Sequence, residues 1–71
     1  MKIRKIEILK NGGKNIVDDD IDLEPDETFD DYCYFEFDDY RDDPGNVVEL
    51  IIQQLDCFGK VIIEQWGYVG R

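Results

Sequence analysis

The chain contains no histidine, no serine and no alanine. Histidine is the side chain that most often carries protons in catalysis near neutral pH, and serine is a common nucleophile. A nucleophile would have to be Cys33 or Cys57, without an imidazole base to activate it, and the acids around Cys33 disfavour its thiolate. The composition therefore predicts that the protein is not an enzyme.

The chain also lacks a long apolar run. No segment approaches the roughly 18 consecutive apolar residues that cross a membrane as a helix. The first five residues begin like the basic region of a signal peptide, but Glu7 and Lys10 interrupt the apolar run that should follow. We therefore predict a cytoplasmic protein whose 71 residues form a single domain, 1–71.

Residues that bind metals are few or badly spaced. Two cysteines without histidine cannot complete the four soft ligands of a zinc site, and we expect both as buried, unreactive thiols. Residues 18–24 alternate acids as the start of a calcium loop does. The sixth position from Asp18 is Leu23 instead of glycine, however, and the twelfth is Phe29 instead of glutamate. The sequence therefore predicts no metal and no cofactor.

What the sequence has in excess is acid, with 18 Asp and Glu against 8 Lys and Arg and a net charge of −10. Residues 1–14 hold five Lys and Arg and one Glu, whereas residues 18–43 hold fourteen Asp and Glu and one Arg. This acidic block carries more than the whole net charge of the chain. Nucleic acids and anionic membranes repel such a chain, which argues against direct binding to either.

Six of the nine aromatic residues lie in the second half of the acidic block, between residues 29 and 40. A disordered acidic tract is normally poor in aromatic side chains. We therefore expect residues 29–40 to fold.

The two ends of the chain predict strands. Residues 2–10 are rich in isoleucine and alternate imperfectly, and residues 14–17 form a short return strand. Between them, Asn11-Gly12-Gly13 supplies residues that accept a positive φ at a tight hairpin. Residues 18–28 hold acids, a proline and few apolar side chains, so we expect a solvated loop. Residues 60–68 are predicted as the last strand.

Side chains alternate along residues 29–39, which indicates a third strand with two faces. One face is formed by Cys33, Phe35 and Phe37, and the other by Tyr32, Tyr34 and Glu36.

The segment from Asn46 to Phe58 predicts a single helix. Asn46 and Glu49 fit a capping box, and a start at Asp43 with Pro44 in the first turn is an alternative. Gly59 would end the helix. Its apolar stripe would consist of Val48, Ile51, Ile52 and Leu55. Together these elements predict an α+β fold with the order β-β-β-α-β. Its small, mainly antiparallel sheet of three or four strands carries one helix on one face.

The acidic surface itself is the candidate functional site. Carboxylates two residues apart on a strand lie about 6.6 Å apart on one face, and such an array imitates a nucleic-acid backbone. We expect the protein to inhibit a nucleic-acid-binding protein by occupying its basic cleft, with aromatic side chains as anchors. In size and charge the chain is similar to the small acidic inhibitors encoded by phages and mobile elements. The predicted partner-binding residues are Asp18, Asp19, Asp20, Asp22, Asp30, Asp31, Tyr34, Glu36, Asp38, Asp39, Tyr40, Asp42 and Asp43.

Two other interpretations stay open. The net charge can serve only to keep a small protein in solution. Alternatively, one helix covers one face of the sheet and leaves an aromatic patch on the other, which makes the protein a structural or regulatory homodimer. The predicted self-association residues are Tyr32, Tyr34, Trp66 and Tyr68.

Overall fold

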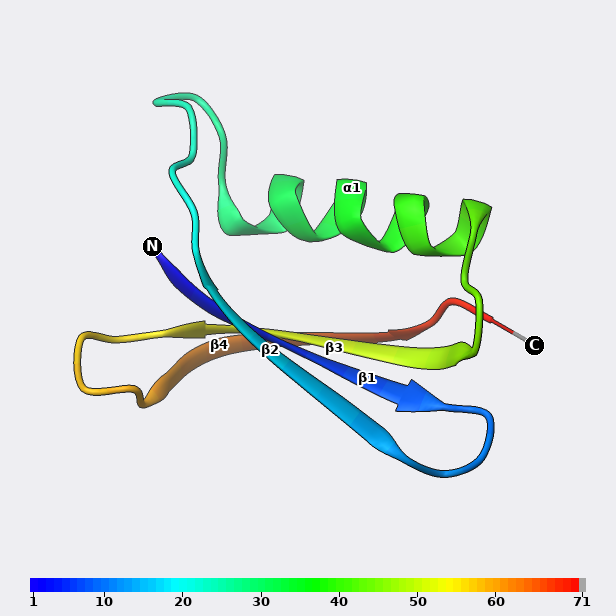
Figure 1. Ribbon diagram of the computed structural model, residues 1–71. Coiled ribbons are helices and arrows are strands. Elements are labelled where there is room, and N and C mark those ends of the chain that lie inside the picture. Colours follow the sequence, from blue (N-terminus) through cyan, green and yellow to red (C-terminus); the bar gives the residue numbers. More distant parts are fainter. Residues whose placement is uncertain (71) are drawn as a thin grey trace.

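A computed structural model describes residues 1–70 of the chain. Its elements are β1 (Lys2–Leu9), β2 (Lys14–Asp20), α1 (Phe29–Asp42), β3 (Val47–Leu55) and β4 (Val61–Tyr68). The strands form one sheet in the order β2-β1-β3-β4 with every neighbouring pair antiparallel, and α1 lies across one side of it (Figure 1). The predicted α+β fold class is confirmed. The predicted order β-β-β-α-β is wrong, since the observed order is β-β-α-β-β.

The first hairpin forms where the sequence predicts it. Gly12 has a φ of 86°, and the Leu9 N–H donates to the Gly13 carbonyl at 2.8 Å. The return strand is longer than predicted, because β2 continues to Asp20 and only residues 21–28 form the connection to α1. The acids at the end of β2 pair with cations on or before β1, so they extend the ladder instead of ending it.

The strand predicted over residues 29–39 is wrong, because these residues lie in α1. Thr28 caps the helix: its hydroxyl accepts the Asp31 N–H at 3.2 Å, and the Asp31 carboxylate accepts the Thr28 N–H at 3.0 Å. Phe29, Cys33 and Phe37 recur at the helical spacing of four and are buried on one side. Alternation within the shorter stretch 32–37 fits a strand equally well, which is why the period alone misleads here.

The helix predicted over residues 46–58 is also wrong, because they form β3 and part of the hairpin that follows. A turn precedes β3, in which Gly45 has a φ of 57° and the Val47 N–H donates to the Pro44 carbonyl at 2.9 Å. β3 is a central strand, with Leu50 and Ile52 buried under α1 while the residue between them faces the other side. A strand that is apolar on both faces shows no alternation, so its sequence resembles a buried helix.

The connection through α1 determines what the helix covers. β2 and β3 are each antiparallel to β1, so they run parallel to each other with β1 between them. A parallel connection must cross over a face of the sheet, and here it carries α1 over that face (Figure 1). In the described residues, 1–70, the opposite face of the sheet has no helix against it. We call this opposite side the open face.

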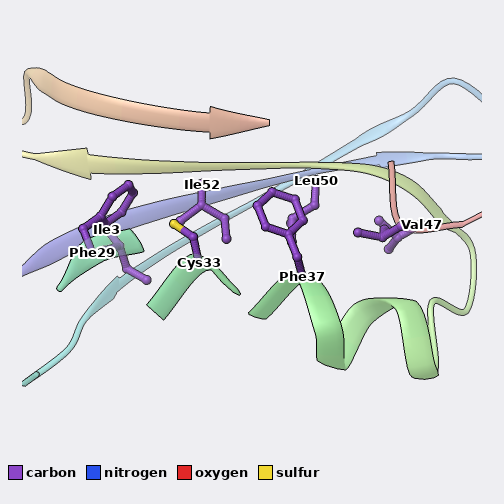
Figure 2. Close-up of a cluster of buried hydrophobic side chains, with 8 residues drawn as sticks. Ile3, Phe29, Cys33, Phe37, Val47, Leu50 and Ile52 are labelled. Atoms are coloured by element: carbon purple, nitrogen blue, oxygen red, sulfur yellow. The ribbon is translucent and has the colours of Figure 1, made fainter. Parts of the chain in front are cut away.

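The core lies between α1 and the two central strands. In Figure 2 the side chains of Phe29, Cys33 and Phe37 point from the helix toward Ile52 and its neighbours on the sheet. The buried cluster consists of Ile3, Phe29, Cys33, Phe37, Val47, Leu50, Ile52 and Val69. Cys33 is buried as predicted. Cys57 is exposed in the hairpin between β3 and β4, so the prediction that both thiols are buried is wrong for it.

Three ionisable groups packed between α1 and the sheet, the Cys33 thiol and the Tyr32 and Tyr40 hydroxyls, make the free energy of unfolding sensitive to high pH. Burial, with Asp30 and Glu36 nearby, raises the pKa of the Cys33 thiol from 9.0 to about 12. Burial likewise raises the pKa of Tyr32 and Tyr40 above the ordinary 10.0, with Glu36 beside Tyr32 and Glu7 beside Tyr40 adding to the shift. Above these ordinary values the unfolded chain loses protons that the folded chain keeps, so stability falls as pH rises.

We therefore expect the midpoint of thermal unfolding to be insensitive to these three groups below pH 9 and to fall steadily between pH 9 and 11. Cys33→Val removes the thiol, so in that variant the fall should begin only with the tyrosines, near pH 10. Melting curves followed by circular dichroism across this range test both points. A midpoint that stays constant up to pH 11 would contradict the burial of these groups.

Candidate functional site

The first acids of the block are paired with the basic start of the chain. Arg4 donates to both carboxylate oxygens of Asp18, at 2.7 and 3.0 Å, and the N-terminal ammonium of Met1 lies 3.1 Å from the Asp20 carboxylate. Hydrogen bonding and opposite charge between Arg4 and Asp18 raise the pKa of Arg4 and lower the pKa of Asp18. The predicted partner-binding residues Asp18 and Asp20 therefore already meet cations of the chain, and part of their charge is neutralised.

Two more of the predicted partner-binding residues point under the helix. The Lys5 ammonium lies 3.2 Å from the Glu36 carboxylate, and the Tyr40 hydroxyl donates to the Glu7 carboxylate. Glu36 and Tyr40 are half-buried in these contacts between α1 and β1. Both residues fix the helix on the sheet and are only partly open to another molecule.

The remaining acids of α1 lie on its solvent-exposed side together with two aromatic residues. Asp31, Phe35, Asp38 and Asp42 recur at i, i+4, i+7 and i+11, which aligns them along one side of a helix. Tyr34 lies beside this line, and its ring meets the Phe35 ring edge-on with 5.6 Å between centroids. All five side chains are exposed, and Phe35 is 59% exposed although the predicted strand places it on one face with Cys33 and Phe37, which are buried. We call these five residues the acidic–aromatic face of α1.

Other predicted acids surround this face. Asp39 and Asp43 are exposed at the C-terminal end of α1, where Asp43 is the last capping residue. Asp30 is exposed in the first turn and accepts a hydrogen bond from Gln65 of β4. Asp22 lies in the connection before α1, and Asp19 lies on the edge strand β2. The structure thus divides the predicted acids between the sheet edge and the outer side of the helix.

The predicted self-association residues do not form one patch. Tyr32 packs against the core from α1, whereas Tyr34 belongs to the acidic–aromatic face. Trp66 and Tyr68 lie on the open face of β4, with their ring centroids 4.9 Å apart. Only these last two are close enough to act together.

An apolar row crosses the open face beside Trp66, and sequence reasoning missed it. Ile6 on β1 is paired with Ile16 of β2 and with Ile51 of β3, and Ile51 is paired with Trp66 of β4. Residues directly opposite in an antiparallel pair share a face, so the four side chains form a continuous row across the sheet. The register that brings them together could not be read from the sequence, because it depends on the crossover through α1.

A hollow of about 430 Å³ opens at one end of the sheet. Arg4, Asp18 and Asp20 contribute its charged lining, and Leu55 and Gly59 close its far side. Arg4 and Asp18 are paired with each other and Asp20 with the N-terminus, and Lys2 and Asp19 complete the charged lining. Within residues 1–70, no group of three or more His, Cys, Asp or Glu side chains is placed to hold a metal ion.

No family model matches the chain, and no curated protein and no solved structure is similar to it. None of the helices in the described part of the chain has the length and apolar character needed to cross a membrane. The function must therefore be argued from the surfaces of this chain.

Proposed function

We propose that the protein is a non-enzymatic inhibitor whose acidic–aromatic face on α1 occupies the basic cleft of a nucleic-acid-binding protein. The observation that carries this proposal is the combination of exposed aromatic rings with exposed carboxylates on one helix face. Carboxylates alone would serve to keep the protein in solution. Exposed rings beside them supply apolar anchors, which a solubilising surface does not need.

The density of charge along α1 supports mimicry of a nucleic-acid strand. Asp30, Asp31, Asp38, Asp39 and Asp42 are exposed along the helix. At about 1.5 Å per residue, the twelve residue steps from Asp30 to Asp42 extend over about 18 Å. One strand of DNA carries roughly five phosphates over that length, at one charge per about 3.4 Å. The number of carboxylates is comparable, and the four from Asp31 to Asp42 form the array that faces a basic cleft, since Asp30 accepts a hydrogen bond from Gln65 of β4 and Arg41 offsets one charge.

The aromatic pair gives the contact a geometry that charge alone lacks. Tyr34 and Phe35 protrude between the acids of the first turn and those at the end of the helix. A helix that inserts one side into a groove is a common mode of recognition, with anchors at i, i+3 and i+4 spacing. Phe35 with Asp31 and Asp38 has this spacing, so the ring can enter an apolar pocket while the acids meet cations around it.

The proposal predicts that affinity depends on where the carboxylates lie and not on the total net charge. Asp38→Asn, Asp39→Asn and Asp42→Asn together should weaken binding about tenfold, because three exposed pairs of roughly 0.5 kcal/mol each are lost. The matched control carries Glu24→Gln, Asp26→Asn and Glu27→Gln in the connection before α1, none of which is a predicted partner-binding residue. Both variants have the same net charge, and the control should keep most of the affinity. For the wild type, association should slow as salt rises.

Competition with DNA is the measurement. A basic partner captured on the immobilised chain is eluted with salt and loaded with a fluorescent DNA duplex, and the free chain is then titrated in while anisotropy is followed. The wild type and the control variant should release the duplex at similar concentrations, and the helix variant only at higher ones. A partner that retains its duplex at saturation, or equal loss of affinity in both variants, would contradict the proposal.

A further inference from the structure

The two edges of the sheet are built differently. The edge strand β2 carries Lys14 and the acids Asp18, Asp19 and Asp20, and charges of this kind block pairing with another strand. The other edge strand, β4, has the sequence VIIEQWGY, with Glu64 as its one charged residue, no proline and a high content of β-branched and aromatic residues. Val61, Ile62, Ile63, Trp66 and Tyr68 are all exposed on it. Charged side chains therefore disfavour pairing with another strand at the β2 edge, and β4 lacks this protection.

We propose that β4 pairs with β4 of a second copy of this chain, so that two four-stranded sheets join into one sheet of eight. This inference is independent of the acidic–aromatic face, because that face lies on α1 and the proposed contact lies on the edge strand β4. The occupant is a second copy because the strand is complementary to itself, in its backbone geometry and in its side chains.

The backbone of β4 fixes how the two copies would meet. The Val69 N–H donates to the Val48 carbonyl at 2.8 Å, in register with the β3–β4 ladder. Because backbone groups alternate in direction along a strand, the N–H and C=O groups of Glu64, Trp66 and Tyr68 point away from β3, toward the free edge, whereas the ladder shifts register at Ile62. Antiparallel pairing through these even-numbered residues places even opposite even. Residues directly opposite share a face, so both helices lie on one side and both open faces on the other.

Charge excludes one register among those that this geometry allows. A two-fold axis at residue 64 would place Glu64 against Glu64 of the second copy, which is unfavourable. An axis at Gln65 or at Trp66 separates the two glutamates, and an axis at Gln65 brings Ile62 close to Tyr68 of the second copy, a favourable combination of a β-branched and an aromatic residue. Trp66 of each copy then lies near the junction. The apolar row on the open face would continue from one sheet into the other.

The size of this contact predicts a weak dimer. At about 200 Å² for a whole aromatic side chain, the exposed 54% of Trp66 and 61% of Tyr68 offer roughly 230 Å². The aliphatic side chains and the strand backbone add to this, but a standard interface buries about 800 Å² per partner. Each copy also carries a net charge of −10. We therefore expect dissociation in the micromolar range, and a dimer that becomes tighter as salt screens the repulsion.

Two isoleucines of equal exposure allow a matched test. Ile62 on β4 is 59% exposed and Ile16 on β2 is 60% exposed. Ile62→Lys places a charge at the proposed junction and should raise the dissociation constant at least tenfold. Ile16→Lys makes the same chemical change on the opposite edge strand, β2, and should leave the dimer intact. Neither side chain belongs to the buried cluster, and circular dichroism with thermal melting checks that both variants fold.

Sedimentation velocity over about 10–300 μM chain, in low and in physiological salt, measures the association. The expected result is a species of twice the 8.4 kDa chain mass for the wild type and for Ile16→Lys, and a monomer for Ile62→Lys. Equal loss of the dimer in both variants would show that the open faces stack on each other, and would overturn the edge pairing. A wild type that stays monomeric throughout would overturn it as well.

Discussion

Replacing Ile52 by alanine should remove most of the stability of the fold. Ile52 is fully buried in the middle of β3, where it packs under α1 beside Cys33 (Figure 2). Truncation of a buried isoleucine to alanine costs about 2–5 kcal/mol. A domain of 71 residues has a total free energy of unfolding of about 5 kcal/mol, because its core is small. The midpoint of thermal unfolding should therefore fall by at least about 10 °C, as measured by circular dichroism.

Phe35→Ala is the matched contrast, and it distinguishes the observed helix from the strand that the sequence predicts. Phe35 lies on the exposed side of α1, so its loss should change stability by no more than about 0.5 kcal/mol. Alanine is also the better helix former. If residues 29–39 formed a strand with Phe35 in the core, this variant would unfold as readily as Ile52→Ala. Similar losses of stability in the two variants would contradict the position of α1.

The parts of the fold that the sequence predicts are those that local chemistry determines. The first hairpin forms at Asn11-Gly12-Gly13 because a positive φ is needed there. The strand β4 is predicted because its residues are mostly β-branched or aromatic. The sequence predicts a strand over residues 29–39 and a helix over 46–58, whereas the structure has a helix and then a strand, and this error has a physical cause. Tyr32 to Phe37 fits two periods at once, and only the capping box at Thr28 with the longer spacing of Phe29, Cys33 and Phe37 favours the helix.

The candidate surfaces depend on tertiary structure to different degrees. The acidic block is evident from composition, and its exposed aromatic residues are evident once the helix is known. The pairing of Asp18 with Arg4 requires the register of the first hairpin, which places the basic and acidic segments side by side. That β4 is an edge strand follows from the crossover through α1, and no local pattern in residues 61–68 reveals it.

The ion pair under α1 gives the second large effect on stability. Lys5 and Glu36 meet between β1 and the helix with side chains only 18% and 24% exposed, and Glu7 lies two residues from Lys5 on the same face of the sheet. Lys5→Met would leave the Glu36 carboxylate half-buried without its cation and close to a second carboxylate. Loss of one partner from a fully buried pair costs about 3–5 kcal/mol, and partial exposure here reduces the expected cost to about 1–3 kcal/mol.

Removing the second charge should restore most of that loss. In the double variant Lys5→Met, Glu36→Gln, no unpaired charge remains at position 36, so its stability should lie closer to the wild type than to Lys5→Met. Urea unfolding of the four proteins of this cycle gives the coupling energy between the two positions. Arg4→Met is the control, because it breaks the solvent-exposed pair with Asp18 and should have only a small effect. If Lys5→Met were no more destabilising than Arg4→Met, the Lys5–Glu36 pair would not be what holds α1 against β1, and the apolar cluster alone would do so.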